Sequence, residues 1–101
     1  MKLDEIERLS EDAARAPLGA AIVDECLALA RLLVDKNAAY GNSALEPVRI
    51  FSKATAVEQI LVRLDDKLSR LARGSAAGED VVLDLMGYLV LLRIAMREEA
   101  K

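Results

Sequence analysis

The segment VVLDLMGYLVLLRIAM, residues 81–96, constrains the fold more than any other part of the chain. Placed at 100° intervals around a helix, its side chains are apolar on every face, interrupted only by Asp84 and Arg93. A helix of this kind is stable only when it is covered all round. Since the other helices of a 101-residue chain can cover roughly two sides of it, we expect another copy of the chain to cover the rest.

Composition excludes several kinds of site. Histidine is absent and Cys26 is the only cysteine, which excludes an intramolecular disulfide, a zinc cluster and a histidine general base. The net charge of −3 gives no support for nucleic-acid binding by bulk charge. The chain has no apolar run long enough to span a membrane, and residues 1–16 are too acidic for a secretory signal. We therefore expect a cytoplasmic protein.

Hydrophobic periodicity predicts an all-α fold in one domain, residues 1–101. Thr55 begins a capping-box pattern and Gly74 is a helix stop, so they bound one long helix. Turn residues and Pro47 make residues 40–55 the one long irregular segment. We expect an up-and-down four-helix bundle with one short N-terminal helix and three long helices, over residues 3–14, 18–37, 55–73 and 79–99.

The third predicted helix carries a polar line. Arg63, Asp66, Lys67 and Arg70 fall at spacings of three and four residues, so three cations and one acid share a flank of the helix. One interpretation is a solvated face with local ion pairs. The other is a phosphate clamp, because arginine suits bidentate phosphate contact and lysine suits contact as a point charge.

The fourth predicted helix carries acids among apolar residues. Asp80 and Asp84 lie one turn apart, and Tyr88 follows after another turn. A carboxylate on an apolar stripe is costly unless it meets a cation or a metal ion. Asp84 therefore implies either an ion pair with a cation of the third helix or a magnesium site shared with an acid of that helix.

The segment KNAAYGNS, residues 36–43, combines a cation, a tyrosine, a turn glycine and small hydrogen-bonding side chains. Exposed backbone N–H groups at such a turn can hold an anion, and a tyrosine can stack on a base. The alternative is a plain helix end capped by the tyrosine.

Three segments together resemble a known family. KNAAYGNS (36–43), VRLDDKLSRL (62–71) and DVVLDLMGYLVLL (80–92) are similar in order and spacing to the nucleotide modification associated domain 1 family of bacteria and phages. That family resembles the MazG-like all-α nucleotide pyrophosphohydrolases. The resemblance implies a helical bundle that binds nucleotides at its helical interface and assembles as a homo-oligomer.

The resemblance also nominates individual residues. MazG-like enzymes hold magnesium with ExxE and ExxD pairs, and neither pattern is intact in this chain. Asp66, Asp80 and Asp84 are the implied magnesium ligands, with Asp66 and Asp84 also catalytic. The implied nucleotide-binding residues are Lys36, Tyr40, Gly41, Asn42, Ser43, Arg63, Lys67, Arg70 and Tyr88.

Three functions remain open at this point. The first is magnesium-dependent release of pyrophosphate from a (deoxy)nucleoside triphosphate, with carboxylates in place of histidine as ligands and base. The second is a non-catalytic module that binds or sequesters a nucleotide. The third is a purely structural helical oligomer, in which a cation of the third helix neutralises Asp84.

Overall fold

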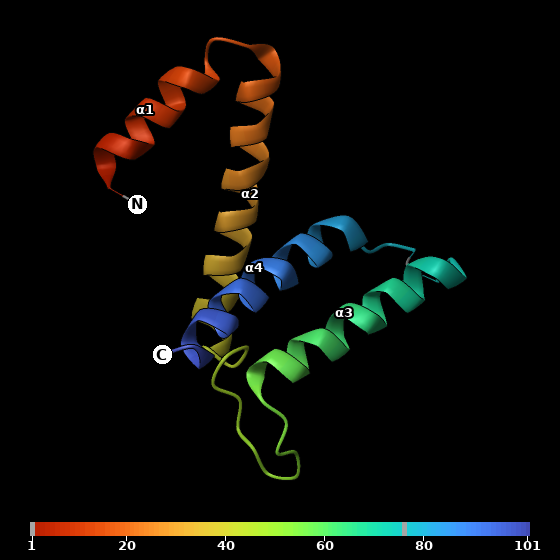
Figure 1. Cartoon of the computed structure of the whole chain (residues 1–101). Coiled ribbons are helices and arrows are strands. Elements are labelled where there is room, and N and C mark those ends of the chain that lie inside the picture. Colours follow the sequence, from red (N-terminus) through yellow and green to blue (C-terminus); the bar gives the residue numbers. More distant parts are fainter. Residues whose placement is uncertain (1, 76) are drawn as a thin grey trace. The chain divides into compact units, whose positions relative to one another are not determined.

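The computed structural model describes residues 2–75 and 77–101, and these form four α-helices and no strand (Figure 1). The all-α prediction is therefore confirmed for the described residues. No helix among them is both long and apolar enough to cross a membrane. Two compact units make up the chain, Met1–Val34 and Asp35–Lys101. The helices are α1 (Leu3–Ala13), α2 (Pro17–Tyr40), α3 (Ala56–Arg73) and α4 (Val81–Glu99).

The helix ends follow local sequence signals. The Thr55 hydroxyl accepts a hydrogen bond from the Glu58 N–H at 3.1 Å and so caps α3, as the capping-box pattern predicts. Gly74 ends α3 in the left-handed conformation, with φ of 69°. α2 runs three residues beyond its predicted end, because nothing before Gly41 breaks it. Gly41 and Asn42 then both adopt positive φ values, of 60° and 64°.

The first unit has little core of its own. Leu29 is its one buried hydrophobic side chain among the described residues, and the apolar stripe of α1 is exposed. The corner between α1 and α2 is tight, since a Cβ on Gly19 would lie 2.7 Å from the carbonyl oxygen of Ala13. Only glycine fits this corner without a backbone shift.

The second unit is organised around the antiparallel hairpin of α3 and α4 (Figure 1). Ile60, Leu64 and Ala95 form its buried centre, and Leu45 from the preceding loop packs against them. The small Ala95 side chain, 1% exposed, lets the two helices approach closely at this point. The hairpin thus fixes the positions of all side chains that α3 and α4 carry on their facing sides.

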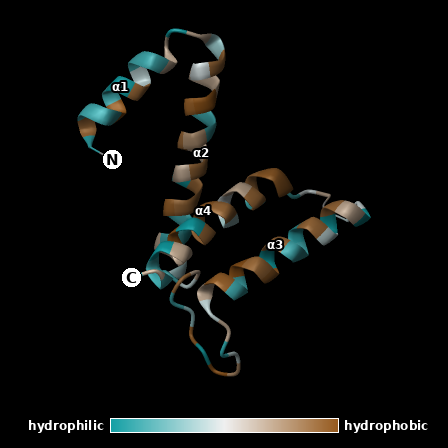
Figure 2. Cartoon of the chain, viewed as in Figure 1, coloured by the Kyte–Doolittle hydropathy of each residue, from teal (hydrophilic) through white to brown (hydrophobic). Residues whose placement is uncertain are grey.

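Much of the apolar surface of the second unit remains uncovered. Hydrophobic residues occupy most of α4 in Figure 2, whereas hydrophilic residues are prominent along α3. Val82, Leu89 and Met96 of α4 are 64%, 50% and 56% exposed. α4, which is apolar all round, therefore packs mainly against α3. Its other sides are left available to a further partner.

Candidate functional site: a polar cluster between α3 and α4

A network of five charged side chains joins α3 to the start of α4. The Lys67 ammonium lies 3.2 Å from Asp84 Oδ2 and 3.3 Å from Glu79 Oε2. The Arg70 guanidinium lies 2.7 Å from Glu79 Oε1 through Nη1 and 3.3 Å from Asp66 Oδ2 through Nε. We refer to Asp66, Lys67, Arg70, Glu79 and Asp84 as the Lys67 cluster.

The hairpin explains why these residues meet. Lys67 and Arg70 lie three residues apart on the C-terminal half of α3, and Asp84 lies in the first turn of α4. Because the helices are antiparallel, these two ends are neighbours. Cations near a helix C-terminus and acids near an N-terminus also interact favourably with the helix dipoles. Backbone and side-chain electrostatics therefore favour the same arrangement.

Lys67 is the most enclosed member of the cluster. Its side chain is 16% exposed, against 24% for Asp84 and 32% for Glu79. The hydrogen bond to Asp84 is the main cause that raises the pKa of Lys67 above its usual value of 10.5, and Glu79 acts in the same direction. Partial burial of the Lys67 ammonium lowers its pKa, but by less than the two carboxylates raise it. The lysine is therefore held charged, between two carboxylates.

The raised pKa of Lys67 predicts a loss of stability in alkali. The stabilisation by Lys67 is complete below the usual value of 10.5, and it is lost as the pH rises through the higher pKa of the folded state. We expect the free energy of unfolding to fall over this window by more in the wild type than in Lys67→Met. Urea denaturation of both proteins between about pH 8 and pH 11 measures the difference. Equal pH dependence in the two proteins would contradict the prediction.

The structure brings together four of the residues nominated from the sequence, namely Asp66, Lys67, Arg70 and Asp84. Asp80 instead caps α4: its Oδ1 accepts a hydrogen bond from the Leu83 N–H at 3.0 Å. Tyr88 packs against the buried centre of the hairpin. Arg63 is exposed, and within the described residues it forms no ion pair with the cluster.

The nominated loop residues lie apart from the cluster. Lys36, Tyr40, Asn42 and Ser43 are exposed, and in the part of the chain that the structure describes no hydrogen bond or ion pair joins them to it. Asn42 instead lines a groove beside Ala95. Ala95 is eleven residues beyond Asp84 on α4, a rise of about 16 Å.

Glu79 is the member of the cluster that sequence analysis missed. By itself, an acid at the start of a helix indicates only a favourable interaction with the helix dipole. A stronger signal is the short connection after Gly74, because a tight turn returns the residues before α4 to the last turns of α3. An acid in that connection is then well placed to meet Lys67 and Arg70.

The donor set of the cluster fits a divalent cation only in part. Over residues 2–75 and 77–101, no group of three acidic or cysteine side chains is close enough to hold a metal ion. Glu79 and Asp84 nevertheless face the same ammonium group, so their oxygens lie no farther apart than the two ion-pair distances combined. Magnesium commonly takes one or two protein carboxylates, with water and substrate phosphates as its other ligands.

No protein-family model, no curated protein and no solved structure matches the chain. The chemistry of the cluster is therefore argued from its own geometry. Two cations and three carboxylates meet at one end of the α3–α4 hairpin. Lysine and arginine are side chains that contact phosphates, and carboxylates are side chains that ligate divalent cations.

Proposed function

We propose that the chain is a nucleotide-binding protein of the MazG-like kind, which binds the magnesium complex of a nucleoside triphosphate at the Lys67 cluster. The observation that carries this proposal is the Lys67 ammonium, held between Glu79 and Asp84 at 3.3 Å and 3.2 Å. An ammonium in this position places one positive charge between two carboxylates, where a divalent cation would place two.

Charge supports the binding of a metal complex over a bare phosphate. The cluster has one more carboxylate than cations, and the Asp80 carboxylate adds a further negative charge nearby. A bare polyphosphate would be repelled by this excess. If Glu79 and Asp84 held magnesium, Lys67 and Arg70 would be the cations free to contact phosphate oxygens, the lysine as a point charge and the arginine in bidentate fashion.

The residues of the Lys67 cluster also support a proposed reaction. Bound magnesium would neutralise the developing charge on the phosphates and lower the pKa of a water molecule. Because the chain has no histidine, a carboxylate has to accept the proton of that water. We assign this role to Asp66, whose carboxylate contacts Arg70, while Glu79 and Asp84 would hold the metal. In the proposed reaction the water oxygen would bond to the α-phosphorus of a (deoxy)nucleoside triphosphate. The bond from that phosphorus to the oxygen that bridges to the β-phosphorus would break, and pyrophosphate would leave.

The proposal predicts magnesium-dependent nucleotide binding. In calorimetry with a panel of nucleoside and deoxynucleoside triphosphates, we expect at least one to bind with magnesium and to bind much more weakly with a chelator. Lys67→Met and Asp84→Asn should each weaken binding by about tenfold or more, because each removes a charge-assisted contact. Arg73→Met is the matched control, since Arg73 is an exposed cation on the same helix.

Two outcomes would decide against parts of this proposal. If no triphosphate binds, or if binding is unchanged in Lys67→Met and Asp84→Asn, the cluster is not a nucleotide site. If nucleotide binds without magnesium and no pyrophosphate is released, the chain is instead the sequestering module.

A purely structural role is the second candidate, favoured by the ion pair of Asp84 with Lys67 and by the exposed apolar side chains of α4. In that role the cluster only joins α3 to α4, and the chain functions as a homo-oligomer. Asp84→Asn would then destabilise the protein, and no triphosphate would raise its stability.

A further inference from the structure

The loop before α3 contains a long accessible segment. Residues 47–53, PVRIFSK, are here called the arm. Every arm residue after Pro47 is exposed, and Val48, Ile50 and Phe51 are 86%, 75% and 96% exposed. Within the described residues no backbone N–H or carbonyl group of the arm bonds to another backbone group. The side chains and the backbone of the arm are therefore both open to a partner that binds an extended chain.

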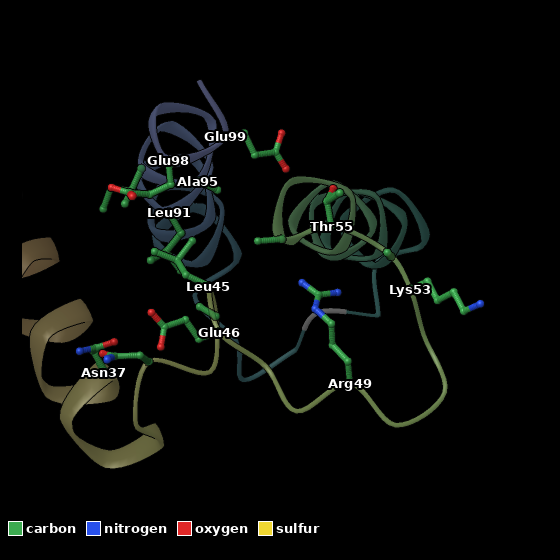
Figure 3. A pocket seen from close by; sticks show the side chains of 15 residues that line it. Asn37, Leu45, Glu46, Arg49, Lys53, Thr55, Leu91, Ala95, Glu98 and Glu99 are labelled. Atoms are coloured by element: carbon green, nitrogen blue, oxygen red, sulfur yellow. The ribbon is translucent and has the colours of Figure 1, made fainter. Parts of the chain in front are cut away.

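Arg49 is the basic residue near the middle of the arm. Figure 3 shows the backbone running as a loop through Arg49 and Lys53 to Thr55, where α3 is capped, with the Lys53 side chain extending away from the groove. Arg49 and Lys53 border this groove, but neither side chain forms a hydrogen bond or ion pair with another described residue. Each cation is therefore available to a binding pocket of another molecule.

Most basic residues outside the arm lie where the backbone is bonded. The majority of the 14 are within helices, in which N–H and carbonyl groups are paired along the helix. Arg15 lies in the connection between α1 and α2, but its N–H donates to the Asp12 carbonyl at 3.3 Å, and the Ala16 N–H donates to the Ala13 carbonyl at 3.4 Å. Among the described loops between helices, an unbonded stretch around a basic residue therefore occurs in the arm.

Within the arm, the bond after Arg49 is more accessible than the bond after Lys53. The chain after Lys53 leads directly into α3: the Ala54 N–H donates to Ser52 Oγ at 3.1 Å, and the Thr55 hydroxyl caps the helix. The bond after Arg49 has unbonded arm backbone on both sides. A cleft that binds several extended residues on each side of a basic residue therefore fits best at Arg49.

We propose that the arm is a processing site for an endoprotease that cleaves after basic residues, and that the bond cut is Arg49–Ile50. Exposed loops are the preferred sites of proteolytic cleavage. An acidic pocket of such a protease holds the basic side chain, and an extended segment bonds to the cleft through its backbone. Water is the second reactant. The bond from the Arg49 carbonyl carbon to the Ile50 nitrogen breaks, the water oxygen joins that carbon, and a proton of the water joins that nitrogen.

This cut divides the chain without touching the centre of the hairpin. The buried side chains Ile60, Leu64 and Ala95 all lie after the bond, as does the Lys67 cluster. Leu45, which packs against that centre, lies before the bond. Cleavage therefore ends the covalent link between the first 49 residues and the hairpin. The inference does not depend on nucleotide binding, and a failure of the nucleotide experiments would leave it standing.

The first test is limited digestion of the full chain with trypsin, followed by mass spectrometry of the intact products. We expect the first products to be residues 1–49 and 50–101. Arg49→Gln should slow the loss of the full chain about tenfold or more, because the acidic pocket loses its cation. Arg63→Gln is the matched control, since Arg63 is an exposed arginine in the middle of α3, and its rate of digestion should equal that of the wild type.

A second pair of variants keeps Arg49 and changes only the residue after it. Ile50→Pro removes the N–H of the bond to be cut, and it is compatible with the loop because this N–H bonds to no described backbone group. We expect Ile50→Pro to slow the cut about as much as Arg49→Gln and Ile50→Val to leave it unchanged. Circular dichroism should show the same helix content in all variants, because the changed residues are exposed.

The use of the site is tested on the chain recovered from its native cells, which should include a form that begins at Ile50. Recovery of the uncut chain alone would overturn the processing role. A first trypsin cut at Arg15, or cuts at many bonds at similar rates, would overturn the assignment of the arm as the preferred site. An unchanged rate of digestion in Arg49→Gln would overturn the choice of the Arg49–Ile50 bond.

Discussion

Ile60→Ala is expected to lower the free energy of unfolding by about 2–5 kcal/mol. Ile60 is 3% exposed and forms the small buried centre of the hairpin together with Leu64 and Ala95. Truncation removes apolar contacts and leaves a cavity at the helix crossing. A small domain has a total stability of only about 5 kcal/mol, so this loss would remove a large share of the stability of the second unit. Urea denaturation followed by circular dichroism measures the loss.

Val62→Ala is the matched control for Ile60→Ala. Val62 lies on the same helix, but its side chain is 64% exposed, so we expect a change within about 0.5 kcal/mol. Equal effects of the two substitutions would show that the α3–α4 contact is not the centre of the folded unit.

Lys67→Met is expected to lower the free energy of unfolding by about 1–3 kcal/mol at neutral pH. The substitution removes the ammonium that lies within 3.3 Å of both carboxylates, so Asp84 loses its ion-pair partner while Glu79 keeps Arg70 at 2.7 Å. Arg73→Met, at an exposed position on the same helix, should change stability little. Thermal denaturation of the three proteins in low salt provides the comparison.

The same variant tests the proposed metal site without a nucleotide. If Glu79 and Asp84 hold magnesium, millimolar magnesium should raise the melting temperature of Lys67→Met more than that of the wild type, because the ion binds only the folded state. A double variant that also carries Asp84→Asn should lose this response. If magnesium changed the melting temperature equally in the wild type, in Lys67→Met and in the double variant, Glu79 and Asp84 would not be its ligands.

Local signals in the sequence were sufficient to predict the helices. Thr55 and Gly74 bound α3 as predicted, because capping depends on residues within one turn of the helix end. α2 extends three residues beyond its predicted end, because Ala38, Ala39 and Tyr40 tolerate helix and the positive φ values come only at Gly41 and Asn42.

The sequence by itself determined that this chain is helical, where its helices begin and end to within a few residues, and that Asp84 needs a partner. Hydrophobic period, capping and the cost of an unpaired carboxylate are local properties. Only the tertiary structure decided that the partner is Lys67, that Glu79 belongs to the same cluster, and that Asp80 is a helix cap. These outcomes depend on which face of α3 meets α4, and Ile60, Leu64 and Ala95 set that contact across more than thirty residues of sequence.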